Sequence, residues 1–168
     1  MADDGESLSP ASTIGPRSAA ETVLFTFVPV AGSISYEIFS ANITNPGQFI
    51  KLFSPFELIV ANGLWFNSHL GVGLYIFSRK HIATASVPYR VLYSALGSVI
   101  FNFGSVLLWA TGKAVLPPHP PTRVAFGALS GLVFLSLGYS YFRFVDALCL
   151  RCLPFNGRVV DTVEEEVD

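Results

Sequence analysis

The chain has 168 residues and a formal net charge of −2, and 51% of its residues are hydrophobic while only 13% are charged. Soluble domains carry about 25% charged residues, so the composition disfavours a soluble all-α protein, and without a basic excess we expect no nucleic-acid binding. The two cysteines lie three residues apart and therefore cannot form a disulfide framework between distant segments.

The first segment, residues 1–21, is polar, acidic and rich in proline, serine and alanine. It shows no basic region followed by an apolar run and a cleavage site, the pattern of a cleaved signal peptide. We expect a disordered cytoplasmic tail here.

Four apolar stretches follow, at residues 22–41, 56–77, 91–111 and 124–144. Each is long enough to cross about 30 Å of hydrocarbon, which takes about 20 helical residues. Helices are expected because backbone polar groups in lipid must be paired within the segment. The sequence therefore predicts an all-α integral membrane protein, with four transmembrane helices packed as a small bundle over residues 22–144. The first stretch is the least regular, because Pro29 interrupts it.

The distribution of basic residues predicts the orientation. If all four stretches cross, seven of the ten Lys and Arg lie on the side that holds both termini. An excess of Lys and Arg marks the cytoplasmic side, so both termini are expected in the cytoplasm. The C-terminus stays cytoplasmic even if the first stretch does not cross. The protein is expected in an endomembrane or the plasma membrane, and the sequence does not indicate which.

Several residues are expected near the outer ends of the helices. Tyr36 and Trp109 are predicted at the headgroup level, which amphipathic rings favour, and Glu37 is predicted to reach water from a position about one turn inside. Asn42 begins an Asn-Ile-Thr sequence, a candidate glycosylation site. Its position next to the first stretch favours a chance match.

Small and polar residues recur at helical spacing in the last three stretches. In membranes such residues let helices approach closely and hydrogen-bond across the contact. The predicted packing residues are Gly63 and Gly71 in the second stretch, Ser94, Ser98 and Ser105 in the third, and Gly127, Gly131 and Gly138 in the fourth.

Asn67, His69 and Asn102 are predicted near the bilayer midplane. Asn67 and His69 are two residues apart and so point about 200° away from each other on a helix. Two interpretations remain open. The favoured one is that these side chains hold helices together; the alternative is a polar pathway for an ion, proton or small substrate in a channel or transporter component.

The C-terminal segment, residues 145–168, is predicted to be a cytoplasmic acidic tail. Cys149 and Cys152 lie close to the membrane, where palmitoylation is favoured over inert thiols or a redox pair. The last four residues are similar to the C-terminal tetrapeptide of the major cytosolic chaperones, which tetratricopeptide-repeat proteins bind through its carboxylate; a solvated, disordered tail is the simpler interpretation. These four residues are Glu165, Glu166, Val167 and Asp168.

Motifs of enzymes are not found in the sequence. There is no phosphate-binding glycine loop, no H-E-x-x-H and no G-x-S-x-G, so we expect no cofactor, no metal and no catalytic residue. The predicted function is that of a small non-enzymatic subunit or organiser, which packs in the bilayer against a membrane-protein partner or against copies of itself.

Overall fold

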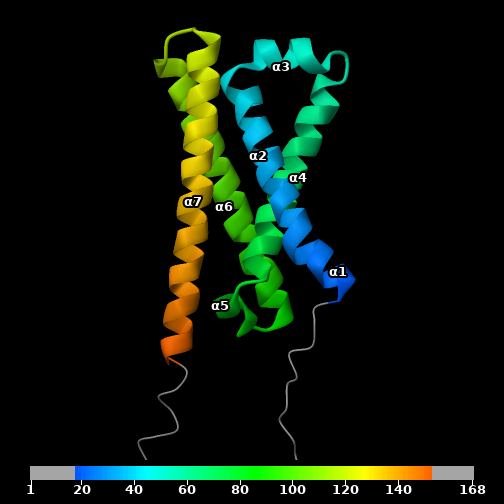
Figure 1. The fold of residues 1–168 in the computed structure, drawn as a ribbon, viewed down its shortest axis with the longest axis vertical. Helices are drawn as coiled ribbons and strands as arrows, with labels where there is room; N and C mark the ends of the chain where they lie inside the picture. Colours follow the sequence, from blue (N-terminus) through cyan, green and yellow to red (C-terminus); the bar gives the residue numbers. More distant parts are fainter. Residues whose placement is uncertain (1–17, 153–168) are drawn as a thin grey trace, which may run out of the picture.

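The computed structural model describes residues 18–152, where it contains helices and no strands (Figure 1). This confirms the all-helical prediction for the described part of the chain. In chain order the elements are α1 (Ala19–Thr22), η1 (Val23–Phe27), α2 (Val28–Thr44), α3 (Pro46–Phe53), α4 (Glu57–Phe77), α5 (Lys80–Ala83), α6 (Val87–Val115) and α7 (Pro120–Cys152).

Three helices are long and apolar enough to cross a membrane: Ala19–Thr44, Val87–Val115 and Pro120–Cys149. A fourth is added if α3 and α4, which meet at a bend of 111°, are counted as one crossing. The polar residues in the middle of α4 lower the hydropathy of that helix. Three of the helices extend beyond the apolar stretches of the sequence, whereas α4 coincides with its stretch. The first helix begins at Ala19, within the segment predicted to be a disordered tail.

The first helix passes through Pro29 without a break. A proline removes one helical hydrogen bond and crowds the preceding turn. Just before it, the N–H of Val28 donates to the carbonyl of Val23, five residues earlier, and the turn widens into the π-helix η1. Such single wide turns inside α-helices absorb local strain, which explains why the predicted interruption does not end the helix.

The long helices run between two ends of the molecule. Figure 1 shows α3 and the α6–α7 connection at one end, which we call the α3 end, and α1, α5 and the end of α7 at the other, the α5 end. Both ends of the described chain, residues 18 and 152, lie at the α5 end. The α2 helix packs against α4 and α7, and α4 also packs against α6.

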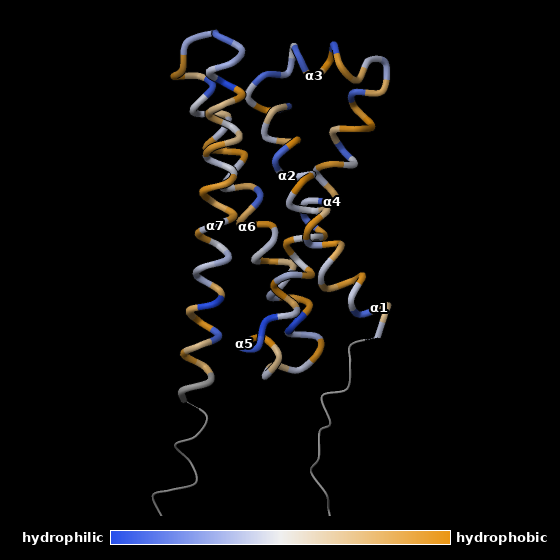
Figure 2. The backbone as a smooth tube through the Cα atoms, viewed as in Figure 1, coloured by the Kyte–Doolittle hydropathy of each residue, from blue (hydrophilic) through white to orange (hydrophobic). Residues whose placement is uncertain are grey.

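The distribution of side chains is the reverse of that in a soluble protein. Among residues 18–152, the large apolar side chains are mostly exposed along the helices, as in Leu107 (69%) and Leu137 (59%). The buried side chains include many small polar ones: Ser35, Ser40, Thr44, Ser68, Ser94, Ser98, Asn102 and Ser105. Figure 2 shows hydrophobic residues along the long helices and hydrophilic residues around α5. The interior is therefore held largely by polar and small residues.

Two glycines bring α2 and α4 into close contact. A Cβ atom added to Gly32 would lie 2.6 Å from the Cα of Gly71, and one added to Gly71 would lie 2.7 Å from the Cα of Gly32. Both neighbours are backbone atoms, which cannot move aside cheaply. The crossing therefore requires glycine on both helices.

Candidate functional site

Asn67 belongs to the contact between α4 and α2. Its Nδ2 donates a hydrogen bond of 2.8 Å to the Oγ of Ser35. Gly71 lies one turn further along the same face of α4 and meets Gly32. Gly63, one turn earlier, has open space where a Cβ would stand. On this face of α4, Asn67 and Gly71 therefore contact α2. Gly63 contacts no other helix in the described part of the chain.

The opposite contact of α4, with α6, uses Asn102. The Oγ of Ser68 donates to Oδ1 of Asn102 at 2.5 Å, and Nδ2 of Asn102 donates to the carbonyl of Ser98 at 2.9 Å. The Oγ of Ser98 in turn donates to the carbonyl of His69 at 2.6 Å. Both polar atoms of the buried Asn102 amide are thus hydrogen-bonded, Oδ1 to α4 and Nδ2 within α6. Ser68 makes the side-chain hydrogen bond from α4 to Asn102. The sequence did not indicate a role for Ser68, because its neighbours Asn67 and His69 are the more unusual residues in an apolar helix.

The His69 ring does not join this network. Its Nδ1 lies 2.8 Å from the carbonyl of Trp65, so Nδ1 carries the proton and donates to that oxygen. The ring packs against Trp65 at 4.3 Å between centroids and edge-on to Phe103 at 6.0 Å. The other nitrogen, Nε2, is buried and has no hydrogen-bond partner among the described residues.

The polar face of α6 continues toward the α3 end through two buried aromatic side chains. The hydroxyl of Tyr36, in α2, donates to Oγ of Ser105 at 2.7 Å. Its ring packs on Trp109 at 4.9 Å, and Nε1 of Trp109 donates to Oγ of Ser130, in α7, at 3.0 Å. Tyr36 and Trp109 are 1% and 0% exposed. They join α2, α6 and α7 in the interior, so both rings pack between helices and do not face outward. Their predicted depth at the headgroup level stays a prediction.

The glycine stripe of α7 lies against other helices of the chain. A Cβ on Gly127 would lie 3.0 Å from Oγ1 of Thr44, and one on Gly131 would lie 2.7 Å from Oε1 of Glu37. Further along, Gly138 faces the ring of Phe101 in α6. Glu37 therefore rests against α7 in the space that Gly131 leaves, with Oε1 buried and unpartnered among the described residues. The sequence had indicated a side chain that reaches water.

The predicted polar residues do not form one site. Asn67 faces α2, Asn102 faces Ser68 on α4, and the ring of His69 packs on aromatic side chains. A groove of about 420 Å³ between η1, α4 and α6 is lined by His69 and largely by apolar residues. Ser94, buried beside it, donates to the carbonyl of Arg90, in its own helix, at 2.7 Å.

A charged cluster at the α5 end was not predicted from the sequence. Asp146, on α7, accepts a hydrogen bond of 3.1 Å from the backbone N–H of His81, and the His81 Nδ1 lies 2.7 Å from the same oxygen. Arg79 lies 3.9 Å from the other oxygen of Asp146. The sequence offered no signal that would pair the 78–86 connection with α7, since about 65 residues separate the partners.

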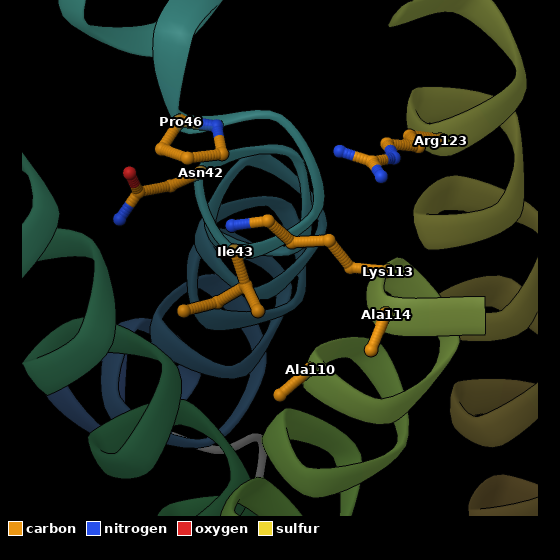
Figure 3. A pocket seen from close by; sticks show the side chains of 7 residues that line it. All are labelled: Asn42, Ile43, Pro46, Ala110, Lys113, Ala114 and Arg123. Carbon is orange, nitrogen blue, oxygen red and sulfur yellow. The ribbon is translucent and has the colours of Figure 1, made fainter. Parts of the chain in front are cut away.

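An open pocket of about 660 Å³ lies at the α3 end, between α2, α6 and the start of α7 (Figure 3). We call it the α3-end pocket. Its lining residues are Asn42, Ile43, Pro46, Ala110, Lys113, Ala114 and Arg123. The candidate glycosylation residue Asn42 is thus part of a helix and lines this pocket.

The remaining predicted sites lie at the C-terminal end. Cys149 is a free, half-buried thiol on α7, and Cys152 is the last residue of that helix. The predicted recognition residues Glu165 to Asp168 lie outside the described residues. Within residues 18–152, no group of three or more His, Cys, Asp or Glu side chains is placed to hold a metal ion.

No protein-family model matches the chain, and no similar curated protein or solved structure is found.

Proposed function

We propose that the chain is an integral membrane protein with four transmembrane helices, with α4 as the fourth crossing and both termini in the cytoplasm. The observation that supports this most strongly is the reversed distribution of side chains: serines and Asn102 are buried, while leucines and valines are exposed. Soluble proteins rarely expose contiguous apolar surface of this extent. Lipid would cover the exposed face, and the small polar residues would pack the helices.

We further propose that the protein acts as a non-enzymatic subunit or organiser. Its mid-helix polar side chains are occupied in contacts within the chain: Asn67 with Ser35, and Asn102 with Ser68. A polar pathway through Asn67, His69 and Asn102 is less well supported, because these side chains face three different surroundings. The outer surface of the four helices is then what remains to contact another membrane protein or a second copy.

The outward-facing polar residues of α7 indicate where such a contact would form. Ser136 and Ser140 are one turn apart and exposed, near exposed apolar side chains such as Leu132 and Leu137. Hydroxyl groups that face lipid gain from a partner helix, at about 1 kcal/mol or less each. Gly131, in contrast, contacts Glu37 within the chain, so an enlarged residue there tests the fold of the monomer and not the assembly.

The test compares native masses of the full chain after purification in a gentle detergent. The wild type is expected as a homo-oligomer or a stoichiometric complex with a membrane protein. The S136L/S140L variant should lose that assembly, while its helix content and its own elution as a folded monomer are kept. A wild type that remains a lone monomer, and that shows ion or proton flux in vesicles abolished by His69→Ala, would replace the organiser by the pathway.

A further inference from the structure

The α3-end pocket brings two basic side chains together from different helices. Lys113 lies two residues before the end of α6, and Arg123 lies in the first turn of α7. Figure 3 shows both side chains extending from their helices toward α2. No acidic residue is among the residues that line the pocket.

These two positive charges lack an acidic partner in the described part of the chain. The Arg–carboxylate pair within residues 18–152 joins Arg79 to Asp146, at the opposite end of the molecule, where His81 also contacts Asp146. One nitrogen of Arg123, Nη2, donates to the carbonyl of Leu116 at 3.2 Å, and another, Nε, is buried without a hydrogen-bond partner. Two cations that line one pocket at the edge of an apolar helical bundle favour the binding of an anion.

The position of the α3-end pocket identifies the kind of anion. The pocket lies where α2 and α6 end and α7 begins, which is the level of lipid headgroups if the helices cross the bilayer. Ile43, Ala110 and Ala114 line the pocket beside the two cations. The small alanine side chains leave room between the helices, and their apolar surface continues into that of the helices. An amphiphile with an anionic head and apolar chains fits both parts.

We propose that the α3-end pocket binds the phosphate of an anionic phospholipid headgroup, with Lys113 and Arg123 as its ligands. The planar guanidinium of an arginine can bind two phosphate oxygens, and the ammonium of a lysine adds a compact charge. The acyl chains would lie along the exposed apolar surface of α6. This inference rests on the proposed membrane location, which is measured separately below.

The test uses the full chain, purified in a gentle detergent and mixed with phosphatidylglycerol or phosphatidylcholine, with bound lipid counted by native mass spectrometry. We expect the wild type to retain phosphatidylglycerol roughly tenfold better than phosphatidylcholine, because only phosphatidylglycerol carries a net negative charge to pair with the two cations, and K113Q/R123Q to lose most of that preference. The matched control K51Q/R143Q removes the same charge from exposed residues of α3 and α7 and should keep it. Circular dichroism of each variant checks that the helices remain.

Three results would overturn the proposal. Equal retention of phosphatidylglycerol by K113Q/R123Q and the wild type would show that these two residues do not hold the lipid. If K51Q/R143Q lost the preference for phosphatidylglycerol to the same extent, the preference would depend on the overall charge of the protein and not on the pocket. Displacement of bound phosphatidylglycerol by an equal concentration of inorganic phosphate would identify a site for free phosphate. An alkaline wash of reconstituted vesicles separates these results from failure of the proposed function, because only a protein that is not inserted is washed off.

Discussion

Asn67 and Ser35 illustrate how single polar residues act in this chain. The side-chain hydrogen bond between them is 2.8 Å long and joins α4 to α2. If the helices cross a membrane, neither group has water as an alternative partner. The separated helices then find other partners, which limits the net gain. The contribution of such a pair is therefore modest, and stability depends on several pairs along the same helices.

A double-mutant cycle measures this contribution. Asn67→Ala and Ser35→Ala are each expected to lower the free energy of unfolding, and the coupling energy between them should be about 0.6 kcal/mol, the average for such pairs in membranes. The measurement is reversible unfolding in mixed micelles. Asn62→Ala is the control, because Asn62 is exposed on the same helix. A coupling energy of zero would mean that the Asn67–Ser35 bond does not hold the helices.

Glycines set the packing at the scale of helices. Gly32 and Gly71 let the backbones of α2 and α4 touch, whereas Gly63, on the same stripe of α4, has nothing within 4 Å. The two positions thus provide a matched pair in one helix. Gly63 and Gly71 are both glycines and each lies four residues from Asn67, yet only Gly71 contacts α2 at the crossing.

Gly71→Leu is expected to separate α2 from α4 and to lower the melting temperature in detergent sharply, because its side chain meets backbone atoms. Gly63→Leu should change the melting temperature by a few degrees at most, or raise it, since leucine favours a helix over glycine by up to about 1 kcal/mol. Thermal unfolding followed by circular dichroism compares the two. Equal effects would contradict the assigned crossing point.

The short helix α5 depends on one carboxylate. Asp146 accepts from the N–H of His81 and lies beside its ring nitrogen and Arg79. The variant Asp146→Asn removes the charge and weakens the contacts to both basic residues. Charge-assisted hydrogen bonds of partly buried groups contribute about 1.5–3 kcal/mol, so α5 should detach from α7 while the long helices remain.

Hydrogen exchange of the residues 78–86 measures this release. Faster exchange there, with unchanged exchange in the middle of α6, is the expected result for Asp146→Asn. Arg143→Gln is the control, because Arg143 is exposed on the same helix. If Asp146→Asn left the hydrogen exchange of residues 78–86 unchanged, contacts other than those of Asp146 would hold α5 against α7.

Much of the helical architecture could be predicted, and much of the contact pattern could not. Runs of about 20 apolar residues reveal helices directly, and spacing by three and four places Ser94, Ser98, Asn102 and Ser105 on one face of α6. Spacing does not tell which helix meets that face. Tyr36, Trp109 and Glu37 were assigned by general preferences for interfaces, but the space beside Ser105 and Gly131 depends on how three helices meet, which no single stretch of sequence encodes.

For the molecule as a whole, the proposed membrane location requires that lipid cover the exposed apolar surface. Leu107 and Leu137 are exposed in the isolated chain and must be covered by lipid if the helices cross a membrane. Lys51, in α3, and Thr84, after α5, are exposed at opposite ends of the molecule. They must then lie on opposite sides of the bilayer.

The most direct test labels single cysteines with a membrane-impermeant thiol reagent in intact cells, using the full chain with Cys149 and Cys152 replaced by serine. We expect Lys51→Cys and Thr84→Cys to be labelled from opposite sides of the membrane. Lys51→Cys should be labelled in intact cells if the protein is in the plasma membrane, and only after the organelle membrane is opened if it is in an endomembrane. Thr84→Cys should be labelled once the plasma membrane alone is permeabilised, and Leu107→Cys and Leu137→Cys only after denaturation. Labelling of either leucine position in an intact membrane, or labelling of Lys51→Cys and Thr84→Cys from the same side, would contradict a four-helix membrane protein with an interior of small and polar residues.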